Sequence, residues 1–144
     1  MGKEREEVLT IRISTEEALR LENPQGDSVV MIPFRGQAAG PYFEGEVLPG
    51  GVDTQIIGQP GNRHTLSARY MLQGTDRAGQ RCELYIENNG SFGGVPEAEG
   101  LLFRTTPKII TNSETLSFLN GARLVGEGRP SEDGVEIRIY RLEA

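Results

Sequence analysis

The chain has 144 residues, of which 19 are glycine, and a formal net charge of −6. Glycine at this density excludes a coiled coil or a long-helix bundle, because it destabilises helices. The acidic balance argues against nucleic acids and anionic membranes as partners, since both are bound mainly through Lys and Arg. We expect one domain over residues 1–144, with residues 1–7 as a flexible N-terminus.

Alternating apolar and polar residues, the pattern of a half-buried strand, recur along the chain. The segments with this pattern are 9–13, 43–47, 65–72, 83–87 and 135–140. Turn signals rich in Pro, Gly, Asn and Asp lie at 23–27, 59–62, 74–79 and 131–134. Short strands separated by such turns predict an all-β fold, a single closed or nearly closed antiparallel β-barrel of about eight to nine strands.

Two segments depart from this alternation. Ser14–Glu17 has a hydroxyl followed three residues later by a glutamate, which is the capping-box pattern of a helix start. We therefore predict one short N-terminal helix that begins there and ends before Pro24. The stretch from Asn88 to Gly100 is rich in glycine and lacks alternation, and we predict that it forms a long loop, a lid over a pocket.

The single histidine and the single cysteine limit the chemistry. Cys82 alternates with Leu84 and Ile86, which predicts a buried, inert thiol in a reducing compartment. His64 starts a strand beside a turn and is predicted to be exposed. We expect neither a metal nor a cofactor, because no cluster of His or Cys ligands and no phosphate-binding glycine motif occurs. Without an apolar leader or an apolar run of about 18 residues, we expect a cytoplasmic protein outside membranes.

A polar group follows the glycine pair at positions 50 and 51. Asp53 and Gln55 share one face of a predicted strand. A carboxylate beside an amide is costly in an apolar core, so this face lines a polar pocket or meets solvent. The next strand carries Arg69, which could pair with Asp53 across the sheet. The pair forms a buried site if the arginine face is inward, and a rim salt bridge if the face with Leu66 and Tyr70 is inward.

Six short motifs occur in a fixed order. They are P-G-G-V-D-T-Q at 49–55, L-S-A-R-Y at 66–70, E-N-N-G at 87–90, F-R-T-T-P at 103–107, F-L-N at 118–120 and V-G-E-G at 125–128. In order and spacing, from Leu9 to Glu143, the chain resembles the Domain of Unknown Function 3237 family, also called uncharacterised protein family 0311. The resemblance implies a small bacterial β-barrel with a polar pocket and no assigned activity. Thr54 stands where the family pattern usually has tryptophan, which reshapes the expected pocket.

The residues and the resemblance together indicate candidate site residues. Asp53 and Arg69 are the candidate catalytic residues, as a general acid or base and as a partner for a carboxylate or enolate. The candidate ligand-binding residues are Gln55, Tyr70, Asn88 and Asn120. For Tyr70 the alternative is a core aromatic.

These residues predict a small-molecule-binding barrel that acts as an isomerase, cyclase or lyase on an oxygenated substrate without a cofactor. Whether the protein is an enzyme stays open at this point. One alternative is a non-catalytic ligand carrier or sensor, which would use the same pocket. The other is a structural module of a homo-oligomer with no ligand.

Overall fold

The computed structural model describes residues 5–58, 63–92 and 100–142, which form antiparallel strands and one short 3-10 helix. The strands are β1 (Arg5–Thr15), β2 (Leu19–Glu22), β3 (Ser28–Ala39), β4 (Phe43–Val47), β5 (Val52–Gly58), β6 (Arg63–Asp76), β7 (Arg81–Phe92), β8 (Phe103–Thr111), β9 (Leu124–Ser131) and β10 (Gly134–Leu142). The 3-10 helix η2 (Ser117–Gly121) lies between β8 and β9. The described residues contain no helix long and apolar enough to cross a membrane.

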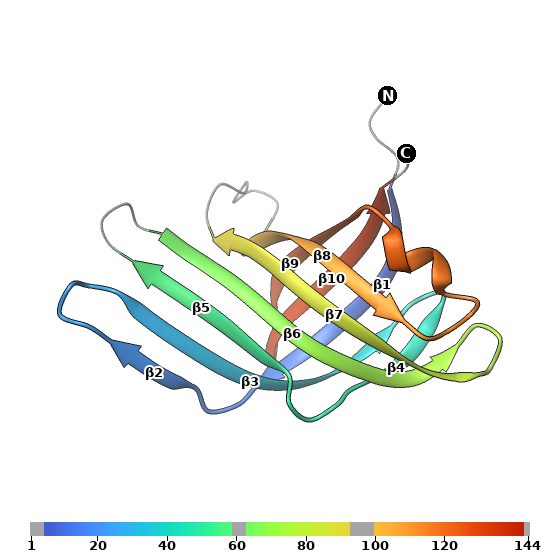
Figure 1. Cartoon of the computed structure of the whole chain (residues 1–144), viewed down its shortest axis with the longest axis horizontal. Coiled ribbons are helices and arrows are strands. Elements are labelled where there is room, and N and C mark those ends of the chain that lie inside the picture. Colours follow the sequence, from blue (N-terminus) through green and yellow to red (C-terminus); the bar gives the residue numbers. More distant parts are fainter. Residues whose placement is uncertain (1–4, 59–62, 93–99, 143–144) are drawn as a thin grey trace.

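Eight strands close into a barrel (Figure 1). They pair antiparallel in the order β1-β10-β9-β8-β7-β6-β4-β3, and β1 closes the ring because it also pairs with β3. The other two described strands are β2, which pairs with β3, and β5, which pairs with β3 and β6. The predicted antiparallel barrel is thus confirmed, with eight strands in the ring and two additional ones.

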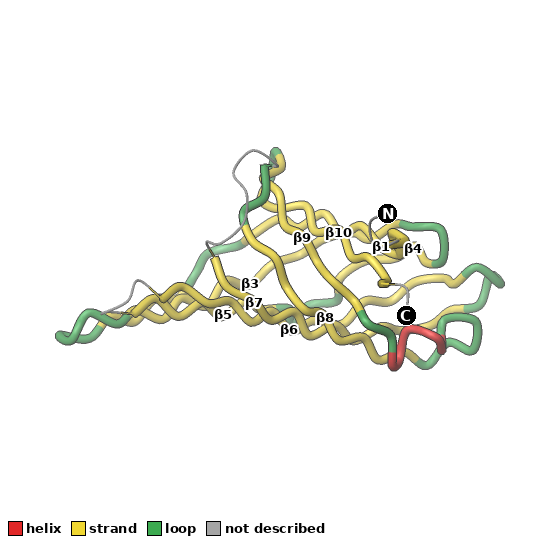
Figure 2. Tube along the Cα trace, turned by 90° about the horizontal axis from the view of Figure 1, so that it is seen from above, coloured by secondary structure: helices red, strands yellow, loops and turns green. Residues whose placement is uncertain are grey.

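The strand β3 changes partners along its length, and this extends the sheet beyond the barrel. Its first half, residues 28–33, pairs with β5 on one edge, and residues 28–31 pair with β2 on the other. Its second half pairs with β4 and β1 instead. We call β2, β5 and residues 28–33 the wing. In Figures 1 and 2 the wing extends beyond β1 and β10, and the first half of β6 runs beside it.

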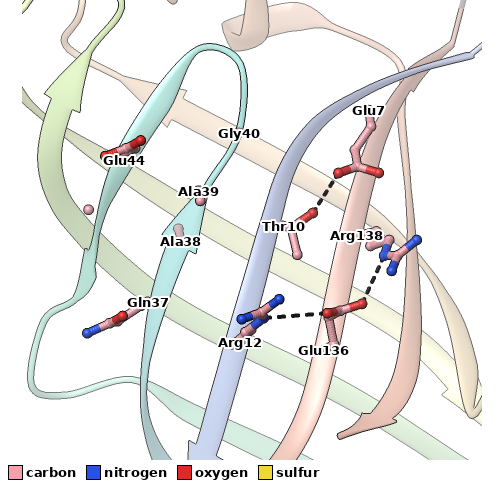
Figure 3. A pocket seen from close by; sticks show the side chains of 11 residues that line it. Glu7, Thr10, Arg12, Gln37, Ala38, Ala39, Gly40, Glu44, Glu136 and Arg138 are labelled. Carbon is pink, nitrogen blue, oxygen red and sulfur yellow. Dashed lines mark hydrogen bonds and ion pairs between the residues drawn. The ribbon is translucent and has the colours of Figure 1, made fainter.

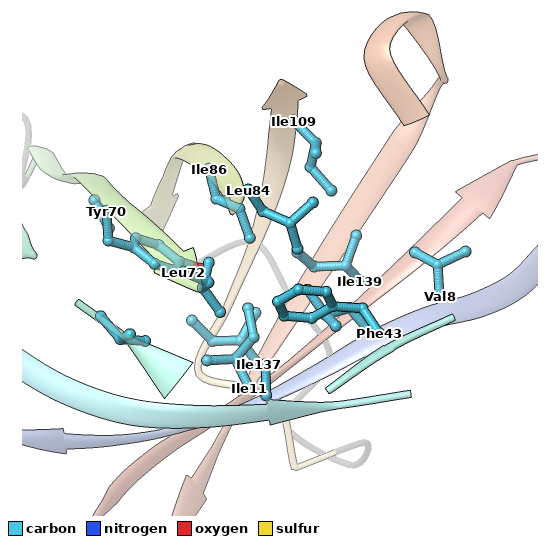
Figure 4. Close-up of a cluster of buried hydrophobic side chains, with 14 of the residues drawn as sticks. Val8, Ile11, Phe43, Tyr70, Leu72, Leu84, Ile86, Ile109, Ile137 and Ile139 are labelled. Carbon is cyan, nitrogen blue, oxygen red and sulfur yellow. The ribbon is translucent and has the colours of Figure 1, made fainter. Parts of the chain in front are cut away.

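The apolar face of each strand fills the barrel interior. On β6, Leu66, Ala68, Tyr70 and Leu72 point inward and are at most 4% exposed, as their alternation predicts. Figure 4 shows other members of this core, among them Val8, Ile11, Phe43, Ile86, Ile109, Ile137 and Ile139. Burying each large apolar side chain contributes roughly 1.5–3 kcal/mol. The alternation of apolar and polar residues along each strand therefore determines which face of the strand points inward.

The predicted N-terminal helix is wrong, because that segment belongs to the sheet. Ser14 and Thr15 end β1, and the N–H of Glu16 donates to the carbonyl of Pro33 at 2.8 Å. Leu19–Glu22 then forms β2, paired with β3. The capping-box pattern is a local signal only, and backbone pairing with β3 before and after residues 16–18 satisfies the polar groups on both sides of it.

Two other predicted segments are described in part. Residues 5–7 begin β1 and pair with β10. Residues 1–4 lie outside the described residues, and the flexibility expected for residues 1–7 stays a prediction. Within the predicted loop 88–100, residues 88–92 belong to β7 and pair with β8, which corrects that end of the prediction. Residues 93–99 lie outside the described residues, so the lid stays a prediction.

Candidate functional site

A glycine pair brings β5 close to the core. Gly50 has a φ of +108°, a conformation that residues with a Cβ rarely adopt. At Gly51 a Cβ would lie 3.0 Å from Tyr70 Cβ and 3.3 Å from the ring of Phe34. The N–H of Phe34 donates to the Gly51 carbonyl at 3.1 Å. The strand β5 therefore starts directly against two core aromatics, and Asp53 follows two residues later.

Asp53 and Asn88 face the barrel interior on either side of a small residue. Asp53 pairs with Ala68, which in turn pairs with Asn88 on the next strand. Residues opposite each other in an antiparallel sheet share a face, and Ala68 points into the core. Gln55, two residues after Asp53, has the same orientation. The prediction that Asp53 and Gln55 share a face is confirmed, and both side chains line the interior.

These side chains line a cavity of about 130 Å³ at the end of the barrel interior where the wing begins. Its apolar lining residues are Ile13, Ile32, Phe34, Leu66, Ala68, Phe92, Leu102, Phe103, Val135 and Ile137. Its polar lining residues are Thr15, Asp53, Gln55 and Asn88. Apolar walls with a few placed polar groups are typical of small-molecule sites. No lysine or arginine in the described ranges lines this cavity.

A chain of hydrogen bonds runs from the cavity toward its rim. Gln55 Nε2 donates to Asp53 Oδ2 at 2.8 Å. With the amide in that orientation, Gln55 Oε1 accepts a hydrogen bond from His64 Nε2 at 2.7 Å. The His64 ring stacks on Phe92, with 3.9 Å between the ring centroids. The sequence therefore missed His64, which was predicted to be exposed and is half-buried against the site. Its even-numbered spacing from Leu66 was the available signal, because residues two apart share a face.

Several buried polar atoms in the barrel interior have no hydrogen-bond partner within the described structure. They are Asp53 Oδ1, the Tyr70 hydroxyl, both amide atoms of Asn88 and Thr105 Oγ1. A Cβ at Gly126 would lie 2.4 Å from Thr105 Oγ1 and 3.5 Å from Asn88 Oδ1, so those two oxygens flank one glycine. A buried polar atom without a partner costs about 1–3 kcal/mol. Of these residues Asp53 and Asn88 line the cavity, and their unpartnered atoms indicate a site that a ligand or water satisfies.

Burial controls the protonation of this group. It raises the pKa of the Asp53 carboxyl, and the hydrogen bond from Gln55 opposes that rise without cancelling it. Burial lowers the pKa of His64, against the charge of Asp53. Burial first, and then the charge of Asp53, raise the pKa of the Tyr70 hydroxyl. The cavity therefore contains a carboxyl that holds a proton at higher pH than an exposed aspartate does.

Arg69 does not join this site. It pairs in register with Val52 and Glu87, one residue away from the row that contains Asp53. Its side chain is exposed on the outer face of β6, while the face with Tyr70 is inward. Of the two alternatives, the inward face is the one with Leu66 and Tyr70, and the buried Asp53–Arg69 pair of the other alternative does not form. The rim salt bridge does not form either, because Asp53 and Arg69 lie on opposite faces of the sheet.

Asn120 and Tyr70 have structural roles in the fold. Asn120 is exposed in η2, where its Oδ1 accepts from the N–H of Thr111 at 2.8 Å and joins η2 to the end of β8. It does not line the cavity. Tyr70 packs edge-to-face on Phe34 with 5.1 Å between ring centroids. It is a core aromatic, as the alternative predicted, with its hydroxyl buried beside Asp53.

A larger hollow of about 740 Å³ lies on the outer surface over β1, β3, β4 and β10 (Figure 3). Four of its charged side chains, Glu7, Arg12, Glu136 and Arg138, have a partner. Glu136 accepts from Arg138 Nε at 2.9 Å and lies 3.6 Å from Arg12 Nε, and Thr10 donates to Glu7 at 2.7 Å. Because these groups are satisfied at the surface, we favour the interior cavity as the functional site.

The structure also bears on the predicted metal and thiol chemistry. The described residues contain no group of three or more His, Cys, Asp and Glu that could hold a metal ion. Cys82 is buried, as predicted, and burial raises the pKa of its thiol. A thiol with a raised pKa is a poor nucleophile at neutral pH.

Known proteins resemble this chain in sequence over most of its length. The family model described as "Protein of unknown function (DUF3237)" matches residues 4–142. A UPF0311 protein of Clostridium acetobutylicum is 29% identical over 154 residues, covering 95% of this chain and 92% of its own. A UPF0311 protein of Rhodopseudomonas palustris is 29% identical over 119 residues, 74% of each chain.

Solved structures agree with this assignment. The crystal structure of a protein of unknown function from Clostridium acetobutylicum has a TM-score of 0.80 and 28% identity, with 99% of each chain covered. A β-barrel-like protein from Acinetobacter baumannii has a TM-score of 0.80 at 21% identity, covering 99% of this chain and 98% of its own. An enzyme from Penicillium herquei has a TM-score of 0.70 at 18% identity, with 99% and 96% covered, and shares the fold. From its match to the family model, the chain belongs to the DUF3237 family.

Proposed function

We propose that the protein binds a small, uncharged, mainly apolar molecule in the interior cavity, and that Asp53 transfers protons to and from it. In this proposal the protein is a cofactor-independent isomerase, cyclase or lyase. The observation that carries this proposal is Asp53 Oδ1, a buried carboxylate oxygen without a partner, beside a cavity that the unsatisfied amide of Asn88 also lines.

The cavity limits the size and charge of the ligand. A cavity of roughly 150 Å³ holds a benzene ring, so about 130 Å³ suits a single ring or a branched molecule of that size. An ionised carboxylate is disfavoured, because Arg69 lies on the outer face and burying an unpaired charge is costly. A hydroxyl or enol that donates to Asp53, together with a carbonyl that accepts from Asn88, matches the polar groups.

The proposed mechanism moves one proton and needs no oxidant. Gln55 binds Asp53 Oδ2, and Oδ1, which has no partner in the described structure, is the oxygen that meets the substrate. As a carboxylate, Asp53 removes a proton next to a substrate carbonyl and returns it at a second atom. Asn88 Nδ2 donates to the carbonyl oxygen as it becomes negative. The raised pKa of Asp53 brings it closer to the range in which a group both accepts and donates a proton.

Thermal-shift screening with matched compound pairs tests this function. Cyclic enols and phenols would be compared with carboxylates of the same size, on wild type, Asp53→Asn and Arg69→Ala. We expect uncharged compounds to stabilise wild type and Arg69→Ala alike. Asp53→Asn keeps the shape of the side chain, so it should bind these compounds but lose turnover. If Asp53→Asn changes neither binding nor turnover of a bound compound, the proposed role of Asp53 is wrong.

A non-catalytic carrier would use the same cavity. Most of the cavity lining is apolar, and such a lining can hold a ligand without reacting with it. Native mass spectrometry of the purified protein would reveal a ligand that co-purifies with it. If wild type binds that ligand tightly and leaves it unchanged on incubation, the carrier function replaces the catalytic one.

A further inference from the structure

The strand β2 leaves one edge of the sheet open. In the described residues β2 pairs with β3 only, and it is the last strand in the sheet order. All four of its residues are exposed, with Leu19 at 70% and Leu21 at 66%. Figure 1 shows β2 at the outer margin of the wing. An open edge presents unpaired N–H and C=O groups to any strand that can pair with it.

The face of the wing that carries these leucines is apolar beyond β2. Leu19 pairs with Met31, and Leu21 pairs with Val29, which in turn pairs with Ile56 on β5. Met31 and Ile56 are each 42% exposed. These side chains share one face because paired residues lie side by side. A contiguous exposed apolar face on a soluble domain indicates an interaction surface.

The sequence of β2 is complementary to a second copy of itself in one register. Leu19-Arg20-Leu21-Glu22 puts both leucines on one face and both charges on the other. If two copies pair antiparallel with Leu21 opposite its own copy, Arg20 lies opposite the partner subunit's Glu22, and the reciprocal ion pair forms by symmetry. The neighbouring register that still keeps the leucines of both copies on one face would put Arg20 opposite the Arg20 of the second copy. Like charges directly opposite each other are destabilising.

We propose that the protein forms a two-fold dimer in which the β2 strands of two copies pair antiparallel in this register. The two sheets then become one continuous sheet. The pairing satisfies the open backbone edge, brings the Leu21 side chains into contact and forms two Arg20–Glu22 pairs. A C2 interface of this kind uses the same patch on both subunits. The proposal rests on β2 alone and is independent of what the interior cavity binds.

Charge exchange tests the register directly. Sedimentation velocity over about 1–100 µM would measure dimerisation of wild type, Arg20→Glu, Glu22→Arg and the double variant. Each single variant puts like charges opposite each other twice, so we expect dimerisation to weaken by about tenfold or more. The double variant restores opposite charges in the same register and should dimerise within about threefold of wild type.

Glu114→Arg, an exposed reversal beside η2, serves as the control and should leave dimerisation unchanged. Circular dichroism of each variant would verify that it is folded. A wild type that stays monomeric throughout the concentration range overturns the proposal. So does a dimer that the single variants leave intact, or a folded double variant that fails to regain dimerisation.

Discussion

Gln55 Nε2 donates to Asp53 Oδ2 at 2.8 Å, while Oδ1 of the same buried carboxylate has no partner. The two residues stand two positions apart on β5, so the strand itself sets this geometry. One oxygen is held by Gln55, and the other has no partner within the described structure. His64 supports the arrangement from the rim, because it binds the other end of the Gln55 amide.

Removing the Gln55 amide should raise the pKa of Asp53. The hydrogen bond stabilises the charged carboxylate and lowers its pKa against the effect of burial, so Gln55→Ala leaves burial less opposed. A carbon-detected NMR titration of the Asp53 carboxyl would measure the shift. Thr54→Ala, at the neighbouring position with the opposite orientation, is the matched control and should leave the pKa near its wild-type value. A pKa that falls in Gln55→Ala would contradict the assigned hydrogen bond.

Glu127 should be important for stability. Its side chain is 3% exposed on the outer side of β9, and its carboxylate lies 3.0 Å from Arg5 and 3.3 Å from Arg104. Glu127→Gln leaves these arginines facing a neutral group. Because the arginine side chains are themselves partly exposed, we expect a loss of about 1–3 kcal/mol in the free energy of unfolding by urea. Glu44→Gln, at an exposed position, should change it by less than about 0.5 kcal/mol.

The same carboxylate should make stability depend on acid pH. Burial acts to raise the pKa of Glu127, but the hydrogen bonds and charges of Arg5 and Arg104 outweigh burial and lower it. The unfolded chain, with a glutamate pKa of about 4.3, therefore takes up the proton first. The contribution of Glu127 is present above that pH and is lost as pH falls through the lower folded-state value. In urea unfolding at several pH values, the free energy of unfolding of Glu127→Gln should fall less steeply with decreasing pH than that of wild type. An equal fall in both proteins would contradict this.

A methyl group at Gly128 should disturb the cavity wall. A Cβ there would lie 2.3 Å from the ring of Phe103, which lines the cavity. Gly128→Ala therefore displaces the ring and should cost about 1–3 kcal/mol while weakening ligand binding. At Gly121 nothing lies within 4 Å of an added Cβ, so Gly121→Ala should leave both properties unchanged. Urea unfolding and ligand titration of both variants measure this, and equal behaviour would contradict the packing described.

Asn120→Ala should affect stability and leave ligand binding unchanged. The side chain accepts from the N–H of Thr111 and fixes η2 to β8, so its removal should cost about 1 kcal/mol. Thermal unfolding and ligand titration would be measured on the same preparation. A tenfold loss of affinity without a loss of stability would contradict this and show that Asn120 takes part in ligand binding.

The alternation of apolar and polar residues along the strands predicts most of the fold, because it shows which face each strand buries. It also places Asp53 and Gln55 together. It does not say which residue of β6 lies opposite Asp53. A change of one residue in the turn between β5 and β6 would move Arg69 into that row in place of Ala68. Whether Arg69 lies opposite Asp53 therefore depends on the register between β5 and β6, which the alternation within each strand does not determine.

The segment 14–22 shows the opposite difficulty, in which a local pattern conflicts with the tertiary structure. A capping box is worth about 1 kcal/mol to a helix, whereas residues 14–15 and 19–22 pair with β3 through their backbones. His64 was missed for a related reason. Its contact with Gln55 joins two strands, and it depends on the same pairing that determines the position of Asp53.

A crystal structure with an uncharged ring compound selected by the thermal-shift screen tests the central claim most directly. We predict that the compound lies inside the barrel, with an oxygen within hydrogen-bond distance of Asp53 Oδ1 and a second polar atom at the Asn88 amide. Binding in the outer hollow beside Arg12 and Glu136, with the interior cavity unchanged, would contradict the account.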